Sequence, residues 1–434
     1  MNSTTNIVTV HALSHEGRGI AKVEDKTVFI EGALPGETVT FVYQKRRRRY
    51  DEAKVIDVLT PSKDRVTPPC PHFMLCGGCS LQHLDPAAQI AFKQNVVLEQ
   101  LQHFGGVIPE TILPPVMGPT IGYRRRARLG VKYVVKKEKI LVGFREKRSG
   151  LLADINQCEV LHPSVGKLIL ALKQLISELD AYSTIPQIEV AIGDKNTALV
   201  FRHLETLSKK DLHSLIAFGE THNIFIYLQP EGPDSVHRVS PAHATPLSYL
   251  LPEFTLEFIF QPINFTQVNA EMNQKMVSTV VDLLNLQPTD RVLDLFCGLG
   301  NFTLPMATRA AKVVGVEGSA LAVQSAQQNA QHNKISNVEF YEENLQKSTF
   351  ETLWVHQSYD KVLLDPPRTG AIEVIPFIAS LGVKRMVYVS CNPATLARDV
   401  GELVKNHGFR LESVGVLDMF PHTTHIESIA VLYG

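Results

Sequence analysis

The sequence predicts an α/β protein made of three parts. In the C-terminal part, strand-like and helix-like segments alternate strictly, which is the pattern of a doubly wound parallel sheet. Its first strand-like run, Arg291–Phe296, is apolar and breaks at a glycine turn before a helix-like segment. The N-terminal part instead contains short strand-like runs punctuated by glycine and proline, which is typical of a small β-barrel. We place the parts at residues 1–62, 63–260 and 261–434, the central one being α+β.

The composition is that of an ordinary globular protein. The chain has 434 residues, of which 44% are hydrophobic and 20% charged. No apolar run approaches the roughly 18 residues of a membrane span, and the N-terminus lacks a basic-then-apolar secretory pattern. We therefore expect a cytoplasmic protein, and a monomer. The formal net charge is −1, so any binding of nucleic acid must use local basic patches.

The N-terminal part is expected to form an OB-like barrel with a basic loop. Five consecutive cations occupy the last connection between strands; they are Lys45, Arg46, Arg47, Arg48 and Arg49. A solvated loop is one interpretation; on an oligonucleotide-binding architecture, contact with phosphates is the other and is preferred here. The stretch EGALPGETV, with the preceding GRGIA, resembles the TRAM domain, an RNA-binding module of RNA-modifying enzymes. The predicted strands are Val8–Ala12, Ile20–Val23, Thr27–Ile30, Thr38–Tyr43 and Lys54–Leu59.

A cysteine-rich loop follows. Three cysteines lie within ten residues of a loop rich in glycine and proline, and such a loop can wrap a tetrahedral metal centre. A fourth thiolate is needed, and one cysteine outside the C-terminal part is available. Four cysteines fit either structural zinc or an iron–sulfur cluster, and a nearby histidine could replace one ligand. The cysteines are Cys70, Cys76, Cys79 and Cys158, and the histidines are His72 and His83.

The central part carries a second basic cluster at Arg124–Arg128. It begins a predicted strand that runs to about Val135, so Arg124, Arg126 and Arg128 share one face. This face is interpreted as RNA-binding, and a merely charged outer sheet face is the alternative. The other elements predicted here are a helix at Asp85–Phe104, a helical stretch at Ser164–Asp180 and a hairpin at Gln187–Phe201.

In the C-terminal part, a ligand is expected beyond the carboxyl ends of the strands. The last two strands are too close in sequence for a crossover, so they must be antiparallel. Glu427, at the start of the last strand, then lies on the same edge as the other strands' ends. The predicted strands are 291–296, 312–317, 337–341, 359–364, 385–390, 410–418 and 425–433, and the predicted helices are 301–311, 319–332, 371–381 and 394–407. The residues expected at the edge are Asp294, Glu317, Asn344, Asp365, Cys391 and Glu427.

Two of these residues are candidates for chemistry. Cys391, in VYVSCNP, comes where a strand stops and a helix begins, a position that lowers the pKa of a thiol and exposes it as a nucleophile. Glu427, in HTTHIES, is interpreted as a general base, with a solvated strand start as the alternative. Cys297, inside the glycine turn, is expected only to pack.

The glycine turn resembles the D-x-F-C-G-x-G-x-F loop of S-adenosylmethionine (SAM) methyltransferases. Together with LLDPPRTG, VSCNP and the terminal HIES, DLFCGLGNF resembles the RNA uracil-5-methyltransferases, and CPHFMLCGGC with the TRAM-like start points to their 23S rRNA members. This resemblance covers nearly the whole chain. It implies a Rossmann-like SAM methyltransferase domain, a nucleophile at Cys391 and a base at Glu427. The target base must be flipped out to reach the pocket, and Phe265 is interpreted as a residue that stacks on RNA, with core packing as the alternative. The resemblance also implies SAM contacts at Gln267, Phe296, Asn301, Glu317, Asn344 and Asp365, and a [4Fe–4S] cluster on Cys70, Cys76, Cys79 and Cys158.

The expected activity is therefore SAM-dependent methylation at C5 of a uridine in 23S rRNA, of the uracil-1939 type, through a covalent bond from Cys391 to C6. The same reaction on tRNA or on another rRNA uridine is the nearest alternative. A different class, an iron–sulfur RNA-binding protein without catalysis, would have no use for an intact cysteine and glutamate at the sheet edge.

Overall fold

The computed structural model describes residues 6–243, 245–347, 349–350 and 352–434. Residues 1–5 of the predicted N-terminal part, residue 244 of the central part, and residues 348 and 351 of the C-terminal part lie outside this description. The chain packs into two compact units that do not follow the sequence in simple blocks. The first unit comprises Met1–Lys93, Phe144–Ala153 and Phe420–Thr424, and the second comprises Gln94–Gly143, Asp154–Met419 and His425–Gly434.

The first unit contains a six-stranded sheet in the order β1-β5-β6-β4-β3-β2. Its core is built from inward-facing apolar side chains such as Ile30, Val39 and Phe41. The predicted strand at Val8–Ala12 is in fact two strands, and β5 is longer than predicted, so that it includes the start of the basic run. The strands are β1 (Asn6–Thr9), β2 (Ala12–Leu13), β3 (Gly19–Val23), β4 (Lys26–Glu31), β5 (Thr38–Arg46) and β6 (Tyr50–Thr60).

The cysteine-rich loop is held within the first unit by the segment Phe144–Ala153. The Gly77 N–H donates to the Arg145 carbonyl (2.8 Å), and the Lys147 N–H donates to the Leu75 carbonyl (3.1 Å). A Cβ added at Gly77 would lie 3.0 Å from the Arg145 carbonyl oxygen, so a larger residue would push the two segments apart. After the loop, helix α1 (Pro86–Gln100) continues into a π-helical turn, η1 (Leu101–Gly105), close to the predicted helix.

Within the second unit, a mixed six-stranded sheet has the order β13-β12-β11-β10-β8-β9, and β14 pairs with β15 as a separate ribbon. The hairpin predicted at Gln187–Phe201 is present as β10 and β11 in antiparallel register. The elements are β8 (Arg126–Val134), η2 (Val135–Lys137), β9 (Lys139–Gly143), α2 (Pro163–Gly166), α3 (Ile169–Glu178), β10 (Gln187–Ile192), β11 (Thr197–Arg202), α4 (Lys209–His222), β12 (Ile224–Gln229), η3 (Pro233–Ser235), β13 (His237–Ser240), β14 (Leu247–Leu251), η4 (Pro252–Phe254) and β15 (Leu256–Phe260).

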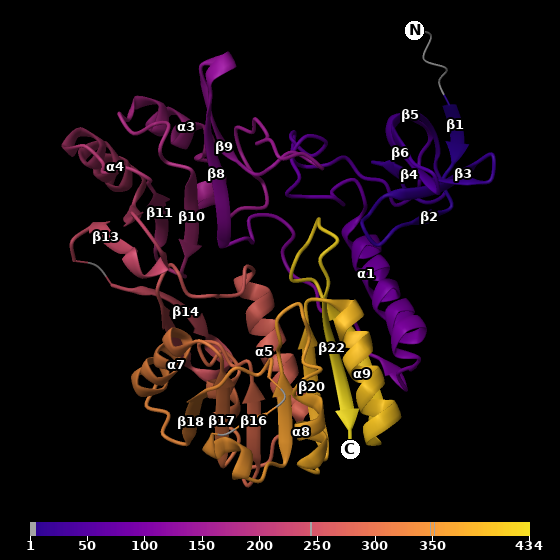
Figure 1. Cartoon of the computed structure of the whole chain (residues 1–434), viewed down its shortest axis with the longest axis vertical. Coiled ribbons are helices and arrows are strands. Elements are labelled where there is room, and N and C mark those ends of the chain that lie inside the picture. Colours follow the sequence, from indigo (N-terminus) through magenta and orange to yellow (C-terminus); the bar gives the residue numbers. More distant parts are fainter. Residues whose placement is uncertain (1–5, 244, 348, 351) are drawn as a thin grey trace. The chain divides into compact units, whose positions relative to one another are not determined.

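The second unit also contains the doubly wound, Rossmann-like sheet that the sequence predicts (Figure 1), in the order β18-β17-β16-β19-β20-β22-β21-β7. The strands from β18 to β20 are parallel, and β22 runs antiparallel to both β20 and β21, which confirms the predicted antiparallel pair. The elements are β7 (Thr111–Ile112), α5 (Ala270–Leu284), β16 (Arg291–Leu295), α6 (Thr303–Ala307), β17 (Lys312–Glu317), α7 (Ala320–His332), β18 (Val338–Glu342), η5 (Leu353–His356), β19 (Lys361–Leu364), α8 (Ile375–Ser380), β20 (Arg385–Ser390), α9 (Pro393–His407), β21 (Arg410–Leu417) and β22 (Glu427–Tyr433).

Two predicted helices are shorter than expected. The helix expected at 301–311 is reduced to α6, because the chain turns back after Ala307 and the Ala311 N–H already donates to the Asp290 carbonyl (2.9 Å) to start β17. The helix expected at 371–381 begins only at Ile375. Among the described residues, no helix combines the length and apolar character needed to cross a membrane.

Candidate active site

The glycine turn after β16 has a backbone that only a few residue types tolerate. Phe296, Gly298 and Gly300 all have positive φ, at 67°, 54° and 84°. The carboxylate of Asp294, fully buried at the end of β16, accepts a hydrogen bond from Thr303 Oγ1 (2.5 Å), which ties the two ends of the turn together. Burial raises the pKa of Asp294 to about 8. Its other oxygen, Oδ1, is buried without a hydrogen-bond partner among the described residues.

Glu317, at the end of β17, supports the same turn from the next strand. One carboxylate oxygen accepts the Gly298 N–H (3.1 Å) and the other accepts the Ser319 N–H (3.0 Å). The glutamate therefore lies where an acid contacts a ribose in such units. Asn344 follows β18 and is exposed, and its side-chain oxygen accepts the N–H of Gln346 (3.0 Å).

Asn301 belongs to a small polar network that the sequence analysis missed. Its amide forms reciprocal hydrogen bonds with Asn273 on α5 (2.9 and 3.0 Å), and its oxygen also accepts the Tyr249 hydroxyl (2.8 Å). Asn273 is a buried asparagine among Met272, Met276 and other apolar side chains of α5. A polar residue on an otherwise apolar helical face was the signal that could have revealed it.

Acidic groups gather at the carboxyl edge of the sheet. The charges of Asp365 and Glu317 both add to the raised pKa of Asp294. Burial raises the pKa of Asp365 itself to about 7. A cluster of carboxylates at one edge favours a cationic ligand, and SAM, which carries a sulfonium and an ammonium group, is such a ligand.

Cys391 and Glu427 lie beside each other at this edge. β20 pairs with β22 so that Ser390 is opposite Ser428, and the Ser428 hydroxyl donates to the Ser390 carbonyl (3.0 Å). Cys391 comes directly after the first serine and Glu427 directly before the second. The charge of Glu427 accordingly acts on the pKa of the Cys391 thiol.

The prediction that the helix terminus lowers the thiol pKa is wrong. Asn392 is the N-cap of α9, yet the pKa of Cys391 is raised to about 11. Burial is the main cause, the carboxyl groups of Glu427 and Asp365 add to it, and the opposing effect of Arg368 is smaller. Withdrawal from water and two acidic neighbours therefore outweigh the helix terminus.

Glu427 is 4% exposed, so the alternative of a solvated strand start is wrong. Burial, and then the charge of Asp365, raises its pKa well above the usual value. A carboxyl group with a pKa shifted upward is suited to accept a proton near neutral pH. Cys297 is buried, as expected of a packing residue.

The D-P-P-R segment after β19 is fixed to the loop that carries Cys391. The Arg368 carbonyl accepts Asn392 Nδ2 (2.8 Å) and the Thr395 hydroxyl (3.3 Å). The Arg368 guanidinium lies 3.2 Å from Nδ1 of His425, two residues before Glu427. These contacts connect the loop after β19, the nucleophile loop and the start of β22.

Phe265 is 75% exposed, which rules out the alternative that it packs in the core. It lies in the loop before α5, which also contains the half-buried Gln267. Arg126 holds this loop, because its Nη1 donates to the Pro262 carbonyl (2.8 Å). The loop therefore presents an aromatic ring to solvent in the same unit as Cys391.

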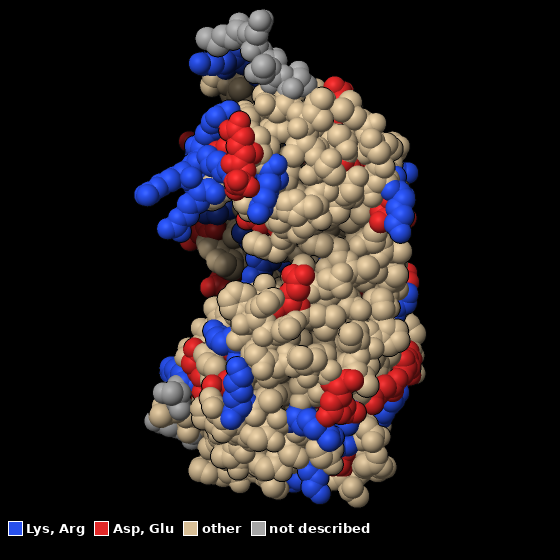
Figure 2. Space-filling view, turned by 90° about the vertical axis from the view of Figure 1, so that its right-hand side faces the viewer, with Lys and Arg blue, Asp and Glu red and all other residues tan. Residues whose placement is uncertain are grey.

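The basic run in the first unit is only partly a loop, which corrects the sequence interpretation. Lys45 and Arg46 belong to β5, because this strand continues its pairing with β6 as far as Arg46, opposite Asp51. The connection itself is therefore formed by Arg47, Arg48 and Arg49. All five side chains are exposed. Figure 2 shows several Lys and Arg side chains projecting from one side of the face in view.

Two members of this basic run have partners in the hairpin. The Arg46 guanidinium lies over the Tyr43 ring, 4.2 Å from its centroid, and Arg47 forms an ion pair with Glu52 (3.6 Å). Arg48 lies at the tip of the hairpin, in the bend between the two strands. Exposed cations on a short turn can approach a phosphate backbone closely, so the tip is the part of the run best placed for such contact.

The second predicted basic cluster is engaged within the protein. Arg128 forms an ion pair with Glu189 (3.0 Å), and Arg125 forms one with Asp194. The Arg124 guanidinium donates to the Arg126 carbonyl (2.9 Å). These partners leave the cluster less available for RNA than the basic run on the hairpin.

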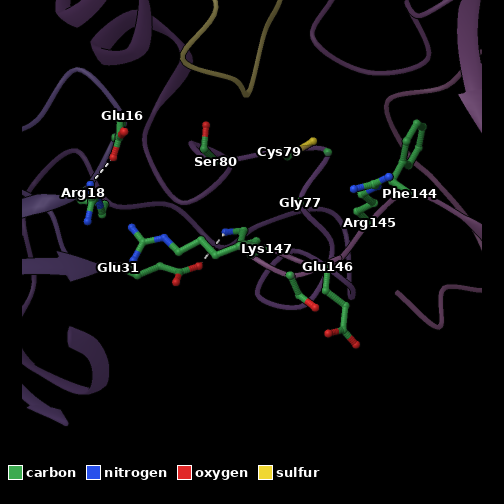
Figure 3. A pocket seen from close by; sticks show the side chains of 15 residues that line it. Glu16, Arg18, Glu31, Gly77, Cys79, Ser80, Phe144, Arg145, Glu146 and Lys147 are labelled. Atoms are coloured by element: carbon green, nitrogen blue, oxygen red, sulfur yellow. Dashed lines mark hydrogen bonds and ion pairs between the residues drawn. The ribbon is translucent and has the colours of Figure 1, made fainter. Parts of the chain in front are cut away.

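The cysteine-rich loop has some features of a metal site. The Gly78 N–H donates to Cys76 Sγ (3.4 Å), and Cys79 lines a cavity of about 490 Å³ with Lys147 and Glu31, which form an ion pair (3.5 Å; Figure 3). Burial lowers the pKa of Lys147, and the charges of Glu31 and, to a smaller extent, of Cys79 and Cys76 oppose that shift. However, within the described residues no three His, Cys, Asp or Glu side chains are grouped to hold a metal ion. The fit to a four-cysteine cluster is therefore incomplete, and the cluster stays a prediction.

The two histidines near the loop differ in burial. His83 is 2% exposed and lies 5.2 Å from the Phe73 ring, centroid to centroid. Burial lowers the pKa of His83 to about 3, so its imidazole is neutral. His72 is exposed.

The fold and this site define the class of protein: a Rossmann-like methyltransferase fold whose ligand edge carries a cysteine and a buried glutamate. A family model described as tRNA (Uracil-5-)-methyltransferase matches residues 253–433, and the TRAM domain matches residues 2–56. A solved tRNA (uracil-54, C5)-methyltransferase of Pyrococcus abyssi, in complex with S-adenosyl-L-homocysteine, has the same fold, with a TM-score of 0.75 at 23% identity over 98% of this chain and 100% of that one.

Curated relatives narrow the class. The 23S rRNA (uracil(1939)-C(5))-methyltransferase RlmD of Nitrosococcus oceani is 55% identical over 98% of this chain and 95% of its own length. The protein of the same name from Alcanivorax borkumensis is 52% identical over 99% of this chain and 96% of its own length. The chain belongs to the RlmD family of RNA uracil-C5 methyltransferases.

Proposed function

We propose that this protein transfers the methyl group of SAM to C5 of a uridine in 23S rRNA, the uracil-1939 type of its relatives. The observation that carries the proposal is the pairing of Ser390 with Ser428, which places Cys391 and Glu427 on adjacent strands at the ligand edge. We further propose that the protein acts as a cytoplasmic monomer.

The reaction needs both residues because C5 of uracil is a poor nucleophile. The Cys391 thiolate adds to C6, which makes C5 enolate-like. C5 then forms a bond to the methyl carbon as the bond from that carbon to the SAM sulfur breaks, and S-adenosyl-L-homocysteine leaves as a neutral thioether. Glu427 then removes the C5 proton. The electron pair of that C–H bond forms the C5=C6 double bond, and the sulfur leaves C6 as a thiolate. The target base must be flipped out of its stack to reach the site.

The raised pKa values fit this sequence of steps. Burial and the acidic neighbours Glu427 and Asp365 raise the pKa of the Cys391 thiol to about 11. The positive charge of SAM, bound beside Asp365, favours the ionised forms of its neighbours and lowers the pKa of the thiol. Attack on uracil thus becomes coupled to SAM binding.

SAM is assigned to the glycine turn and the surrounding polar edge. The open backbone of the turn admits a ligand close to the main chain. The proposed contacts are Gln267, Phe296, Asn301, Glu317, Asn344 and Asp365.

RNA is assigned to two surfaces. Phe265 offers its exposed ring to stack on a base. The exposed cations of the β5–β6 hairpin contact phosphates; they are Lys45, Arg46, Arg47, Arg48 and Arg49. Arg126 contributes mainly by supporting the loop that carries Phe265, since its guanidinium donates to the Pro262 carbonyl, and the Arg124 guanidinium donates to the Arg126 carbonyl.

We propose that Cys70, Cys76, Cys79 and Cys158 hold a [4Fe–4S] cluster. The N–H donor to Cys76 Sγ and the cation of Lys147 suit ligands that are thiolates. When bound, the cluster would tie together the parts of the chain that carry these four cysteines. No step of methyl transfer is assigned to it. Anaerobically purified protein should be brown, with broad absorbance near 400 nm. A colourless protein containing zinc would contradict the assignment.

The first experiment is a covalent trap. The purified protein and SAM are mixed with 23S rRNA fragments or tRNA that carry 5-fluorouridine, and the products are separated on a denaturing gel. Fluorine at C5 does not leave as a proton does, so the adduct persists. The proposal expects a shifted band with 23S rRNA that is absent from Cys391→Ala, whose SAM affinity stays normal. A band only with tRNA would show that tRNA, and not 23S rRNA, is the substrate. No band with either RNA would contradict the proposal that the protein is a catalyst.

A further inference from the structure

The loop Phe420–Thr424 is fastened by hydrogen bonds to the segment that follows the cysteine-rich loop. Both segments belong to the first unit. The His422 carbonyl accepts the N–H groups of Ser80 (2.9 Å) and Leu81 (3.0 Å). Ser80 is the residue directly after Cys79. Two main-chain hydrogen bonds to one carbonyl fix the position of the loop closely, and they depend on the path of the chain after that cysteine.

Gln89, on α1, is the centre of this arrangement. Its side-chain oxygen accepts the His422 N–H (2.8 Å). Its side-chain nitrogen lies within hydrogen-bonding distance of the carbonyls of Leu81 (3.1 Å) and Leu84 (2.8 Å) and of His422 Nδ1 (3.2 Å). Gln89 is 1% exposed and His422 is 4% exposed, so water does not replace these contacts easily.

Lys93, one turn further along α1, adds a charged contact. Its ammonium group donates to the Phe420 carbonyl (2.9 Å), and the residue is only 1% exposed. Burying an ammonium group is costly unless it is hydrogen-bonded. Two polar side chains at i and i+4 on one helical face therefore hold both the start and the middle of the same loop.

The position of this loop in the chain connects it to the chemistry. It lies between β21 and β22, and after Thr424 the chain continues through His425 and Ile426 into Glu427, the first residue of β22. The catalytic base is thus five positions beyond the main-chain groups that Gln89 and the segment after Cys79 hold. Glu427 pairs with Leu417 of β21, and the fastened loop is the segment of chain that leads into this pairing.

We propose that Gln89 is a positioning residue for proton abstraction: it holds the loop before β22 and thereby orients Glu427 toward the C5 proton. The inference rests on the proposed function, because it concerns one of its steps. Addition of Cys391 and methyl transfer do not require the base, whereas removal of the C5 proton and release of the sulfur do. A misplaced Glu427 therefore slows elimination selectively.

The test compares full-length variants on ordinary, unfluorinated RNA. Gln89→Leu is similar in size and removes every hydrogen bond of the side chain, whereas Gln89→Glu keeps an acceptor for the His422 N–H. Gln94→Leu is the matched control, because Gln94 is a half-buried glutamine of the same helix whose side-chain oxygen has no hydrogen-bond partner in the described structure. Each variant is checked for folding by its thermal unfolding and for SAM affinity.

For Gln89→Leu we expect kcat to fall by about 10- to 100-fold, on the scale of a displaced acid–base group. SAM affinity and KM for RNA should stay near wild type, and a covalent protein–RNA band should accumulate during turnover. Gln89→Glu should be intermediate, and Gln94→Leu should match wild type. A merely structural role would lower the amount of active protein without building up the adduct.

Two results would overturn the inference: a folded Gln89→Leu with the wild-type kcat, or a slow variant in which no adduct accumulates. If Gln89→Leu does not fold, Gln89→Glu and His422→Ala give the same readout with smaller expected effects. His422→Ala retains the main-chain hydrogen bonds. Wild-type turnover without adduct in both variants would then reject the inference. The wild-type trap with 5-fluorouridine separates the two proposals. Absence of that adduct rejects the proposed function, whereas its presence with unaffected Gln89 variants rejects only the role of Gln89.

Discussion

Ser390 and Ser428 lie opposite each other where β20 and β22 pair, and the Ser428 hydroxyl donates to the Ser390 carbonyl over 3.0 Å. The antiparallel direction of β22 is what makes this relationship useful. It brings Glu427, at the start of one strand, to the same edge as Cys391, at the end of the other. The pairing of β20 with β22 therefore brings the proposed nucleophile and the proposed base together.

Replacement of Glu427 by glutamine should stall the reaction after methyl transfer. Addition proceeds and elimination does not, because an amide cannot take the C5 proton, so a covalent protein–RNA band should accumulate with ordinary RNA while turnover falls by about 10²- to 10⁴-fold. Denaturing gels over the time course measure the band. The double variant Cys391→Ala/Glu427→Gln should give no such band. Rapid turnover by Glu427→Gln alone would contradict the assignment of Glu427 as the base.

The Cys391 thiol of the ligand-free protein should ionise at unusually high pH. Burial and its acidic neighbours raise its pKa to about 11, so its alkylation by iodoacetamide should keep rising with pH beyond 9. Mass spectrometry of the peptide that contains Cys391 follows the rate. In Glu427→Gln the profile should move to lower pH, because one nearby carboxyl group is removed. A plateau already at pH 7–8 would contradict the proposed electrostatics.

Phe265 should matter for RNA and not for SAM. Loss of stacking on one base costs about 1–3 kcal/mol, so Phe265→Ala should raise KM for RNA by about 5- to 150-fold, while Phe265→Tyr retains most of the affinity. SAM affinity, measured by calorimetry, should not change. Phe104→Ala provides the control, since Phe104 is similarly exposed, at 70%. Equal effects of both alanine variants would argue against stacking by Phe265.

The β5–β6 hairpin should contribute a salt-dependent part of RNA affinity. In the triple variant Arg47→Ala/Arg48→Ala/Arg49→Ala, the slope of log affinity against log salt should flatten by about 0.7–0.9 for each phosphate that is no longer neutralised. Filter binding at several salt concentrations measures this slope. The pair Lys209→Ala/Lys210→Ala removes exposed cations from α4 and should leave the slope unchanged. An unaltered slope in the triple variant would place the phosphate-binding cations elsewhere.

Asp294 should make the stability of the ligand-free protein depend on pH. Its pKa is raised from 3.8 to about 8 by burial, so the folded chain holds a proton there that the unfolded chain releases. The contribution of Asp294 to the free energy of unfolding is therefore fully present below about pH 4 and is lost as the pH rises toward 8. Asp294→Asn removes the dependence, and its Tm relative to wild type should increase from pH 5 to pH 8.5. A constant difference in Tm would show that Asp294 is ionised throughout.

Much of the fold could be predicted from the sequence because local patterns specify it. The apolar runs at 291–295 and 312–317, the intervening glycine turn and the short link between the last strands predict the doubly wound sheet and its antiparallel end. The candidate site residues follow from the rule that ligands bind at the carboxyl ends of the strands. The exposure of Phe265, in contrast, could not be decided from a single aromatic residue in a loop. Nor could a run of five cations show that β5 continues to Arg46 and leaves Arg48 at the tip of the hairpin.

The sequence by itself determined the class of fold, the edge at which the site lies and the residue types available for chemistry, because periodicity and turn residues act over short distances. Only the tertiary structure decided the protonation of Cys391, since burial and the carboxyl groups of Glu427 and Asp365 act on it from other strands. It also decided the partners of Asn301 and of Gln89, which are distant in sequence. Solvent exclusion and hydrogen bonding depend on what surrounds a side chain in space, and no local pattern contains that information.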